Sequence, residues 1–246
     1  MVISHQHRFI FIKTAKTAGT SIEAFLSRHC GAEDVFTPTR PPVEGHQPRN
    51  WQGWFNPLPE IWSFRYPRDP TVFVERRFFT PQRTLKDWWH RRRFHEHIPA
   101  RVAKLRMPEE VWSGYFKFAV ERNPWDKTLS HYHMQRSVRG GNLSLDEYFE
   151  RGEFCLNLPF YTDHDGGLMV DEVIRYEELE EGMGKICGRF GIPWEGSLGV
   201  RAKGDYRQDR THYSQVLTGA QREILARVFA REIGMHGYEW RDGPGG

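Results

Sequence analysis

Apolar residues occur along this chain in short runs, and most runs are followed by a polar turn and an amphipathic stretch. HRFIFIK at 7–13 and YFKFAVE at 115–121 are dense in aromatic and β-branched residues, which predicts two buried strands. A helix start follows each strand. Thr20 with Glu23 three positions later predicts a capping box, and Asn123 before Pro124 predicts an N-cap with proline at the first helical position. The alternation predicts an α/β fold, P-loop-like and three-layered, with a central mainly parallel sheet flanked by helices.

Further helices are predicted from caps, proline starts and apolar spacing, at about 81–93, 99–106, 109–114, 144–152, 177–190 and 218–233. Residues 160–176 are predicted to form a hairpin around Asp165, with DEVIRY as its return strand. The segment 37–70 carries many prolines and glycines, which disfavour regular structure. We therefore expect a single domain over 1–246, with an irregular and helical insertion at 37–106.

Composition narrows the class of protein. A chain of 246 residues and 29.1 kDa is long enough to bury a core, and its mean hydropathy is −0.69. A membrane-spanning helix needs about 20 apolar residues, and the sequence has no such run. The first residues lack the features of a secretion signal, and the three cysteines are widely spaced, which argues against a disulfide framework or a zinc site. A cytoplasmic location is expected.

Charge is distributed unevenly along the chain. The segment 76–106 holds ten basic and two acidic residues, so it carries +8 while the rest of the chain carries −5. Tryptophans and histidines are interleaved with these cations. Such a segment suits an anionic polymer or ligand, although a solvated helix face is the commoner origin of a charge run.

The turn after the first predicted strand is the strongest chemical signal. It reads KTAKTAGTS over 13–21 and leads into a helix. A strand, turn and helix in this order direct backbone N–H groups and the positive end of the helix dipole at one point, which predicts an anion site. Lys16 precedes Gly19, whereas the lysine of a Walker A loop follows its second glycine, so an ordinary ATP or GTP site is disfavoured.

A second signal lies in FAVERNPWDKTLSHYHM at 118–134. Arg122 ends the predicted strand, and Ser130 lies eight positions later on the predicted helix. A long arginine side chain and this serine are able to contact one phosphate beside the helix. Taken alone, the pattern is more typical of an arginine in a structural ion pair.

Together the two motifs resemble those of sulfotransferases that use 3′-phosphoadenosine 5′-phosphosulfate (PAPS). The loop KTAGTS is similar to the PKTGGTS loop of the carbohydrate-type (family 2-like) branch, in its soluble bacterial form, and RNPWDKTLS resembles the second signature of that family. VIRYEEL at 173–179 and the final helix running into GYEW extend the resemblance. Ala15 departs from the family's proline and Ala18 from its first glycine, so the φ of Ala18 must be negative or its strain tolerated.

The resemblance implies roles for individual residues. Lys16 matches the catalytic lysine, and the 5′-phosphosulfate would be held by Lys16, Thr17, Ala18, Gly19, Thr20 and Ser21. Arg122 and Ser130 match the pair that binds the 3′-phosphate. The late segment 201–213 resembles the basic loop that closes over the nucleotide, with candidates Lys203, Arg207, Arg210 and Tyr213.

Sulfuryl transfer needs a base for the acceptor hydroxyl and donors for the leaving phosphate oxygen. HEHIPA resembles an element between the two phosphate motifs of bacterial members, which indicates His97 as the base, with His95 as the alternative. The scheme requires no metal. Asp163, His164 and Asp165 precede two glycines, which is more typical of a hairpin turn than of a metal site.

We therefore predict a PAPS-dependent O-sulfotransferase acting on a hydroxyl of a glycan or glycolipid, without a membrane anchor or nucleic-acid partner. Flat tryptophan faces at 51, 54, 62, 88 and 89 suit sugar rings. Two alternatives stay open, a P-loop nucleotide kinase and a non-catalytic binder of anionic polymers through 76–106.

Overall fold

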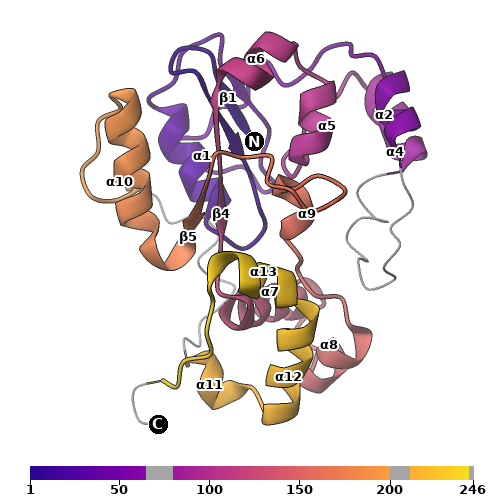
Figure 1. Ribbon diagram of the computed structural model, residues 1–246, viewed down its shortest axis with the longest axis vertical. Helices are drawn as coiled ribbons and strands as arrows, with labels where there is room; N and C mark the ends of the chain where they lie inside the picture. Colours follow the sequence, from indigo (N-terminus) through magenta and orange to yellow (C-terminus); the bar gives the residue numbers. More distant parts are fainter. Residues whose placement is uncertain (65–79, 200–210, 244–246) are drawn as a thin grey trace. The chain divides into compact units, whose positions relative to one another are not determined.

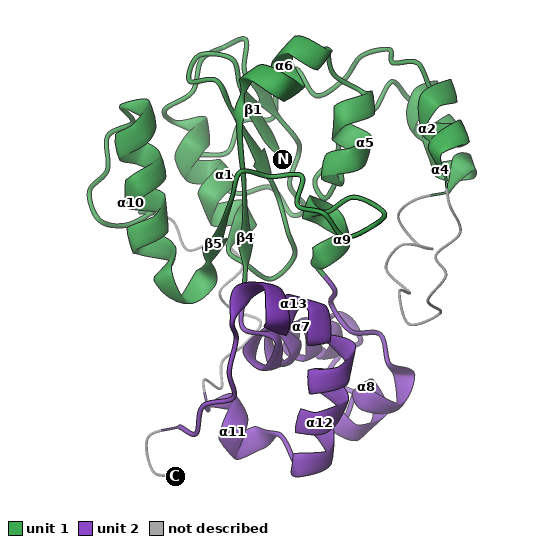
Figure 2. Cartoon of the chain, viewed as in Figure 1, with its two compact units in different colours: residues 1–121, 157–202 green, residues 122–156, 203–246 purple. Residues whose placement is uncertain are grey.

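The structure is a computed structural model that describes residues 1–64, 80–199 and 211–243. The chain divides into two compact units (Figure 2). Unit 1 comprises residues 1–121 and 157–202, and unit 2 comprises residues 122–156 and 203–246. Each unit is described by itself, and the single domain expected over 1–246 stays a prediction.

Unit 1 is built on one five-stranded sheet with the order β3-β1-β2-β4-β5 (Figure 1). Its strands are β1 (Val2–Ser4), β2 (Phe9–Ile12), β3 (Val35–Phe36), β4 (Phe116–Glu121) and β5 (Glu172–Arg175). β4 pairs in parallel with β2 and with β5, whereas β1 pairs antiparallel with β2 and β3. The predicted α/β class is confirmed, and both predicted strands lie in the parallel part of the sheet.

Helices cover both faces of this sheet and make three layers. Along β2, Phe9 and Phe11 join one apolar core, while Ile10 and Ile12 join the other, because successive side chains of a strand point to opposite faces. Helices α1 (Gly19–Ser27) and α10 (Leu179–Phe190) pack on the first face, and α5 (Ala100–Leu105), α6 (Glu109–Gly114) and α9 (Leu158–Tyr161) lie on the other. A strand that is buried on both faces carries a continuous apolar run, as 9–12 does.

Strands β1 and β3 were not predicted, and helix α2 (Leu58–Ser63) forms within 37–70, where regular structure was not expected. Two predicted elements of unit 1 also differ from the prediction. The first is the start of α1. The N-cap is Ala18 and makes no side-chain cap hydrogen bond, so the capping box expected from Thr20 and Glu23 is wrong. Glu23 is instead buried and binds cations elsewhere in unit 1.

The second is the hairpin expected over 160–176. Its first arm is helical, since α9 ends at Tyr161, and only an isolated bridge between Thr162 and Leu168 closes the turn. DEVIRY pairs in parallel with β4 as β5, so its assignment as a return strand is wrong. The turn itself forms as expected, with Asp163 Oδ1 accepting from the N–H of Asp165 at 2.9 Å and of Gly167 at 2.7 Å.

The other described helices of unit 1 are α2 (Leu58–Ser63), α4 (Pro81–Trp89) and the 3₁₀ turn η1 (Tyr176–Glu178). Unit 2 holds α7 (Pro124–Val138), α8 (Leu145–Arg151), α11 (Tyr213–Val216), α12 (Gly219–Val228) and α13 (Ala230–His236). The helix expected over 218–233 is thus two helices that meet at Phe229. None of the helices in the described ranges has the length and apolar character needed to cross a bilayer.

Local caps explain where the helices of unit 2 begin. The side chain of Asn123 accepts hydrogen bonds from the N–H groups of Trp125 and Asp126, and Pro124 occupies the first helical position. Ser144 and Thr218 each form a complete capping box. These three starts confirm the sequence prediction, because every partner lies within three residues of its cap.

Candidate active site

The loop between β2 and α1 has a backbone that is unusual for its residue types. Lys16 has a φ of 63° and Ala18 a φ of 58°, both in the left-handed region that glycine normally occupies. Ala18 therefore has a positive φ, which costs of order 1–3 kcal/mol for a residue other than glycine. Left-handed residues that alternate with others turn successive N–H groups toward one side, which forms an anion-binding concavity.

Helix α1 adds its N-terminus to this loop. The Ile22 N–H donates to the Ala18 oxygen at 3.1 Å, which places residues 19–21 in the first turn of the helix, where backbone N–H groups point toward the N-terminal end. The first turn of α1 contains no acidic residue that would offset the dipole. The loop and the helix start are therefore electropositive through the backbone alone.

Lys13 is not available to an anion, because two carboxylates hold it. Its Nζ donates to Glu23 Oε2 and to Glu96 Oε1, both at 2.6 Å. Burial raises the pKa of Glu23, but the Met1 and Lys13 cations outweigh it and hold that pKa below its ordinary value. A Cβ on Gly19 would lie 2.7 Å from Lys13 Cγ, so only glycine leaves room for this lysine. Lys16 is the lysine that belongs to the loop itself.

Asn157, which is distant from the loop in the sequence, holds the loop backbone through hydrogen bonds. Its Oδ1 accepts from the Ala15 N–H at 2.9 Å, and its Nδ2 donates to the Ala15 oxygen at 3.0 Å. Both backbone groups of one loop residue are thus paired with a single side chain. Thr14 adds a hydrogen bond from its hydroxyl to the Val120 oxygen, and Thr17 contacts the Thr14 hydroxyl at 2.8 Å.

A buried carboxylate holds Asn157 in turn. Asn157 Nδ2 also donates to Glu121 Oε1 at 3.1 Å, and the Tyr161 hydroxyl donates to Glu121 Oε2 at 2.9 Å. All three side chains are buried. Because rigid partners surround it, the Asn157 amide is held in the orientation that the loop backbone requires.

His97 lies against the first residue of the loop. Its Nδ1 is 3.2 Å from the Lys13 carbonyl oxygen, which can only accept, so Nδ1 carries the hydrogen and Nε2 carries the lone pair. Burial, followed by the Lys13 charge, lowers the pKa of His97 to about 4. The imidazole is therefore neutral at pH 7, in a tautomer that accepts a proton at Nε2. The Lys13 charge contributes less to this pKa shift than burial does.

His95 belongs to a different cluster. Its Nε2 lies 3.8 Å from Asp87 Oδ2, and Asp87 is paired with Arg106 at 3.3 Å. Burial and the Arg106 charge hold the pKa of His95 well below its ordinary value. Of the two candidate bases, the structure places His97 at the loop and His95 beside α4.

In unit 2, Arg122 ends the segment before α7 and forms an ion pair one helical turn ahead. Its Nε and Nη2 donate to Asp126 Oδ2 at 2.8 and 2.6 Å. Ser130 lies on α7 and is half-buried. The predicted contact of Arg122 and Ser130 with a 3′-phosphate stays a prediction.

The predicted C-terminal loop is described only in part. Lys203, Arg207 and Arg210 lie outside the described residues. Tyr213 begins α11 and is buried, with its ring stacked at 6.2 Å on Trp125 and its hydroxyl accepting from the Arg241 N–H at 3.1 Å. Its predicted role in nucleotide binding is not tested by this placement.

Three side chains that organise the loop were not predicted from the sequence: Lys13 as an internal ion-pair partner, Glu121 and Asn157. The position of Glu121 in the sequence could have indicated its place near the loop. A carboxylate that ends an apolar strand lies at the carboxyl edge of a parallel sheet, where α/β folds place their binding sites. Nothing in the sequence near Asn157 could have indicated its role, because its partner Ala15 is 142 positions away.

Comparison with known proteins relates the chain to an archaeal protein. No family model matches the chain. An uncharacterized protein of Archaeoglobus fulgidus is 33% identical over 113 residues, which cover 44% of this chain and 94% of that protein. The chain therefore belongs to the same family as this archaeal protein.

Among solved structures, a crystal structure of a sulfotransferase from Alicyclobacillus acidocaldarius is similar to the chain, with a TM-score of 0.40 and 17% identity. The match covers 95% of this chain and 96% of that one.

Proposed function

We propose that this protein is a sulfotransferase that transfers the sulfuryl group of PAPS to an acceptor hydroxyl. One observation carries the proposal. The loop with left-handed Lys16 and Ala18 precedes the start of α1, and His97 is hydrogen-bonded to the loop's first residue. A group that binds anions and a neutral imidazole base thus lie in one small region of unit 1.

Sulfuryl transfer gives His97, Lys16 and the N–H groups of α1 separate roles. The acceptor oxygen forms a bond to sulfur while His97 Nε2 takes the hydroxyl proton, and the bond between sulfur and the 5′-phosphate oxygen breaks. Lys16 and the N–H groups at the start of α1 stabilise the charge that grows on that departing oxygen. Asn157 keeps the loop backbone in place throughout. Arg122 and Ser130 stay the predicted contacts of the 3′-phosphate.

The pKa of His97 supports a role as a general base that becomes effective when PAPS, the sulfuryl donor, is bound. A pKa of about 4 makes His97 a weak base in the free protein. Negative charge brought by a bound phosphosulfate raises the pKa of a nearby imidazole, because it stabilises the protonated form. Binding of the donor therefore moves His97 toward the range in which general bases are effective.

We further propose a carbohydrate hydroxyl as the acceptor. Trp54 and Trp88 support this choice, since their rings lie 5.2 Å apart in the insertion and Trp54 is exposed. Aromatic faces of this kind stack on sugar rings. A panel of sugars, glycolipids and simple alcohols, scored by release of adenosine 3′,5′-bisphosphate, tests the acceptor class separately from the reaction.

The reaction is tested by ligand-dependent melting and by Lys16→Ala. Adenosine 3′,5′-bisphosphate without metal should raise the Tm, whereas ATP with Mg²⁺ should not. Lys16→Ala should lower kcat about 10²- to 10³-fold and leave part of the nucleotide affinity, since its largest effect is on charge that appears in the transition state. Lys185→Ala on α10 is the control, because that lysine is exposed and paired only locally with Glu181 at 2.7 Å.

Stabilisation by ATP with Mg²⁺ but not by the bisphosphate would replace the proposal with a nucleotide kinase. A Lys16→Ala variant with the kcat of Lys185→Ala would remove Lys16 from the mechanism.

A further inference from the structure

Helices α2 and α4 of unit 1 carry charge on the sides that face the protein. Arg106 donates to Glu60 from Nε at 2.8 Å and from Nη2 at 2.9 Å, and the Thr84 hydroxyl donates to Glu60 at 2.7 Å. Asp87 of α4 is buried and accepts from Arg106 at 3.3 Å. An ion-pair network therefore joins the two helices where an apolar core is usual.

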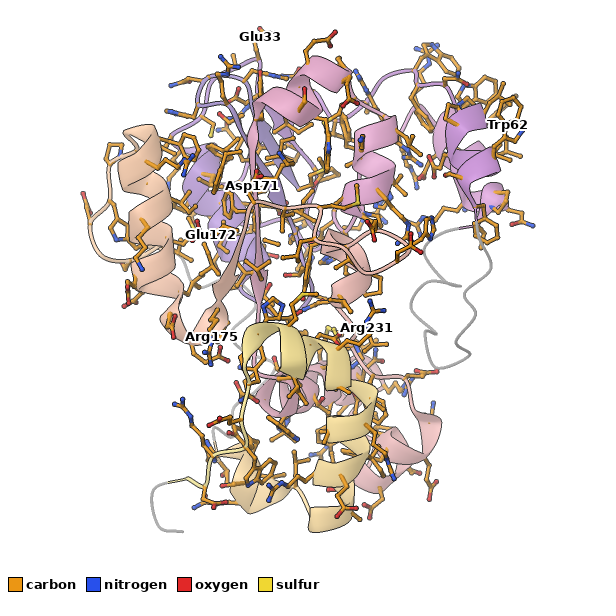
Figure 3. The ribbon with its side chains drawn as sticks, in the orientation of Figure 1. Glu33, Trp62, Asp171, Glu172, Arg175 and Arg231 are labelled. Atoms are coloured by element: carbon orange, nitrogen blue, oxygen red, sulfur yellow. The ribbon has the colours of Figure 1, made fainter. Side chains whose placement is uncertain are left out.

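The opposite sides of the same helices are apolar and exposed. On α2, Leu58 is 48% and Trp62 79% exposed, and on α4, Leu85 is 50% and Trp89 75% exposed. Both pairs have the i, i+4 spacing that shares one helix face. At 3.6 residues per turn, Leu58 and Trp62 lie roughly opposite Glu60. Figure 3 shows Trp62 on α2 away from the sheet. The usual amphipathic pattern of a surface helix is therefore reversed in α2 and α4, with charged residues facing the protein and apolar residues exposed.

The charge on this surface is positive. In the described parts of 45–106, the acidic residues are Glu60, Asp87 and Glu96, and each is held in an ion pair with an arginine or a lysine. Lys86 and Arg91 are exposed, and the Arg91 guanidinium lies 4.8 Å from the centre of the Trp54 ring. Exposed tryptophan and leucine are thus accompanied by cations and not by anions.

We propose that this face, formed by Leu58, Trp62, Leu85, Lys86, Trp89 and Arg91, docks onto the surface of an anionic lipid bilayer. Tryptophan and leucine side chains insert at the boundary between headgroups and acyl chains, and lysine and arginine bind the lipid phosphates. A second copy of the chain fits less well, because a symmetric contact would bring the like charges of the two copies together. The proposal does not rest on the sulfotransferase function.

The test is co-sedimentation of the full chain with vesicles. The wild type should bind vesicles of equal parts phosphatidylcholine and phosphatidylglycerol, and bind those of phosphatidylcholine alone much more weakly. Trp62→Ser with Trp89→Ser should lower the partition coefficient at least tenfold. Lys86→Gln should lower it about fivefold, the effect of one cation at an anionic surface.

A matched pair separates docking from a general effect of apolar side chains. Leu85 is 50% exposed, and Leu168, in the turn between α9 and β5, is 53% exposed. Leu85→Ser should weaken vesicle binding severalfold, and Leu168→Ser should not change it. Circular dichroism establishes that both variants fold, since neither residue contributes to the buried core.

Several results would overturn the proposal. The proposal would be wrong if the wild type failed to sediment with anionic vesicles or bound both vesicle types equally. It would also be wrong if the double tryptophan variant bound anionic vesicles as well as the wild type. Loss of a concentration-dependent dimer in that variant, without vesicle binding, would assign the face to a second copy. Strong protection of the wild-type tryptophans from iodide quenching without lipid would show that another part of the chain covers the face.

Discussion

Replacing Asn157 by alanine should destabilise unit 1 and weaken anion binding together. Asn157 makes three hydrogen bonds, two to the backbone of Ala15 and one to Glu121. Alanine makes none of them. The Ala15 N–H and oxygen then lose their partner, and the Glu121 carboxylate loses the hydrogen bond from Asn157 while it keeps the one from the Tyr161 hydroxyl.

The magnitude follows from these contacts. The bonds are 2.9, 3.0 and 3.1 Å long, and a bond of this kind contributes about 0.5–1.5 kcal/mol net, or more where a charged group takes part. With the cost of removing one hydrogen bond from a buried carboxylate, the free energy of unfolding should fall by about 3–5 kcal/mol. At about 2–4 °C per kcal/mol for a chain of this length, the Tm should drop by roughly 6–20 °C.

The control is Tyr161→Phe, which removes the hydrogen bond from the Tyr161 hydroxyl to Glu121, at 2.9 Å, and leaves the loop backbone untouched. It should cost about 1–3 kcal/mol and leave the affinity for adenosine 3′,5′-bisphosphate near that of the wild type. Asn157→Ala should lower this affinity at least tenfold, because the N–H groups of the loop lose their fixed directions. Urea unfolding followed by circular dichroism and titration calorimetry measure the two effects.

Two results would refute this reasoning. If Asn157→Ala unfolds no more easily than Tyr161→Phe, the bonds to Ala15 contribute little to stability. If Asn157→Ala is destabilised but keeps full nucleotide affinity, then the loop does not depend on Asn157 for its binding conformation.

Arg122→Ala should weaken binding of adenosine 3′,5′-bisphosphate far more than that of the 5′-monophosphate. Equal weakening of both ligands in calorimetry would show that Arg122 has a structural role, to which its ion pair with Asp126 belongs. His97→Ala should lower kcat about 10²-fold or more and remove the acidic limb of the pH profile of kcat/KM, and an unchanged rate and limb would exclude His97 as the base. Because the folded pKa of His97 is about 4 and its ordinary value is 6.5, the unfolded state binds a proton first. Wild-type stability should therefore fall by up to about 3 kcal/mol as pH drops from 6.5 to 4, and His97→Ala should lack this part of the slope in urea unfolding at several pH values.

Local signals in the sequence predicted much of the fold. The apolar runs at 9–12 and 116–121 are strands that lie side by side, and the caps at Asn123, Ser144 and Thr218 begin helices as expected. The loop between β2 and α1 was also located from its sequence, and its binding of an anion stays a prediction. In each case the residues that decide the structure are within a few positions of one another, so their interaction forms in any fold that contains the segment.

The sequence by itself determined strands β2, β4 and β5, several helix starts and the position of the loop, but it did not predict β1, β3 or α2. The tertiary structure decided how the loop is held and what lies beside it. Glu23 illustrates the difference, since its spacing from Thr20 predicts a cap, yet burial beside Lys13 makes it an ion-pair partner. Asn157 and His97 reach the loop from 142 and 84 positions away. Such contacts depend on which strands become neighbours in the sheet, and that choice is made by the packing of both cores at once and not by any local pattern.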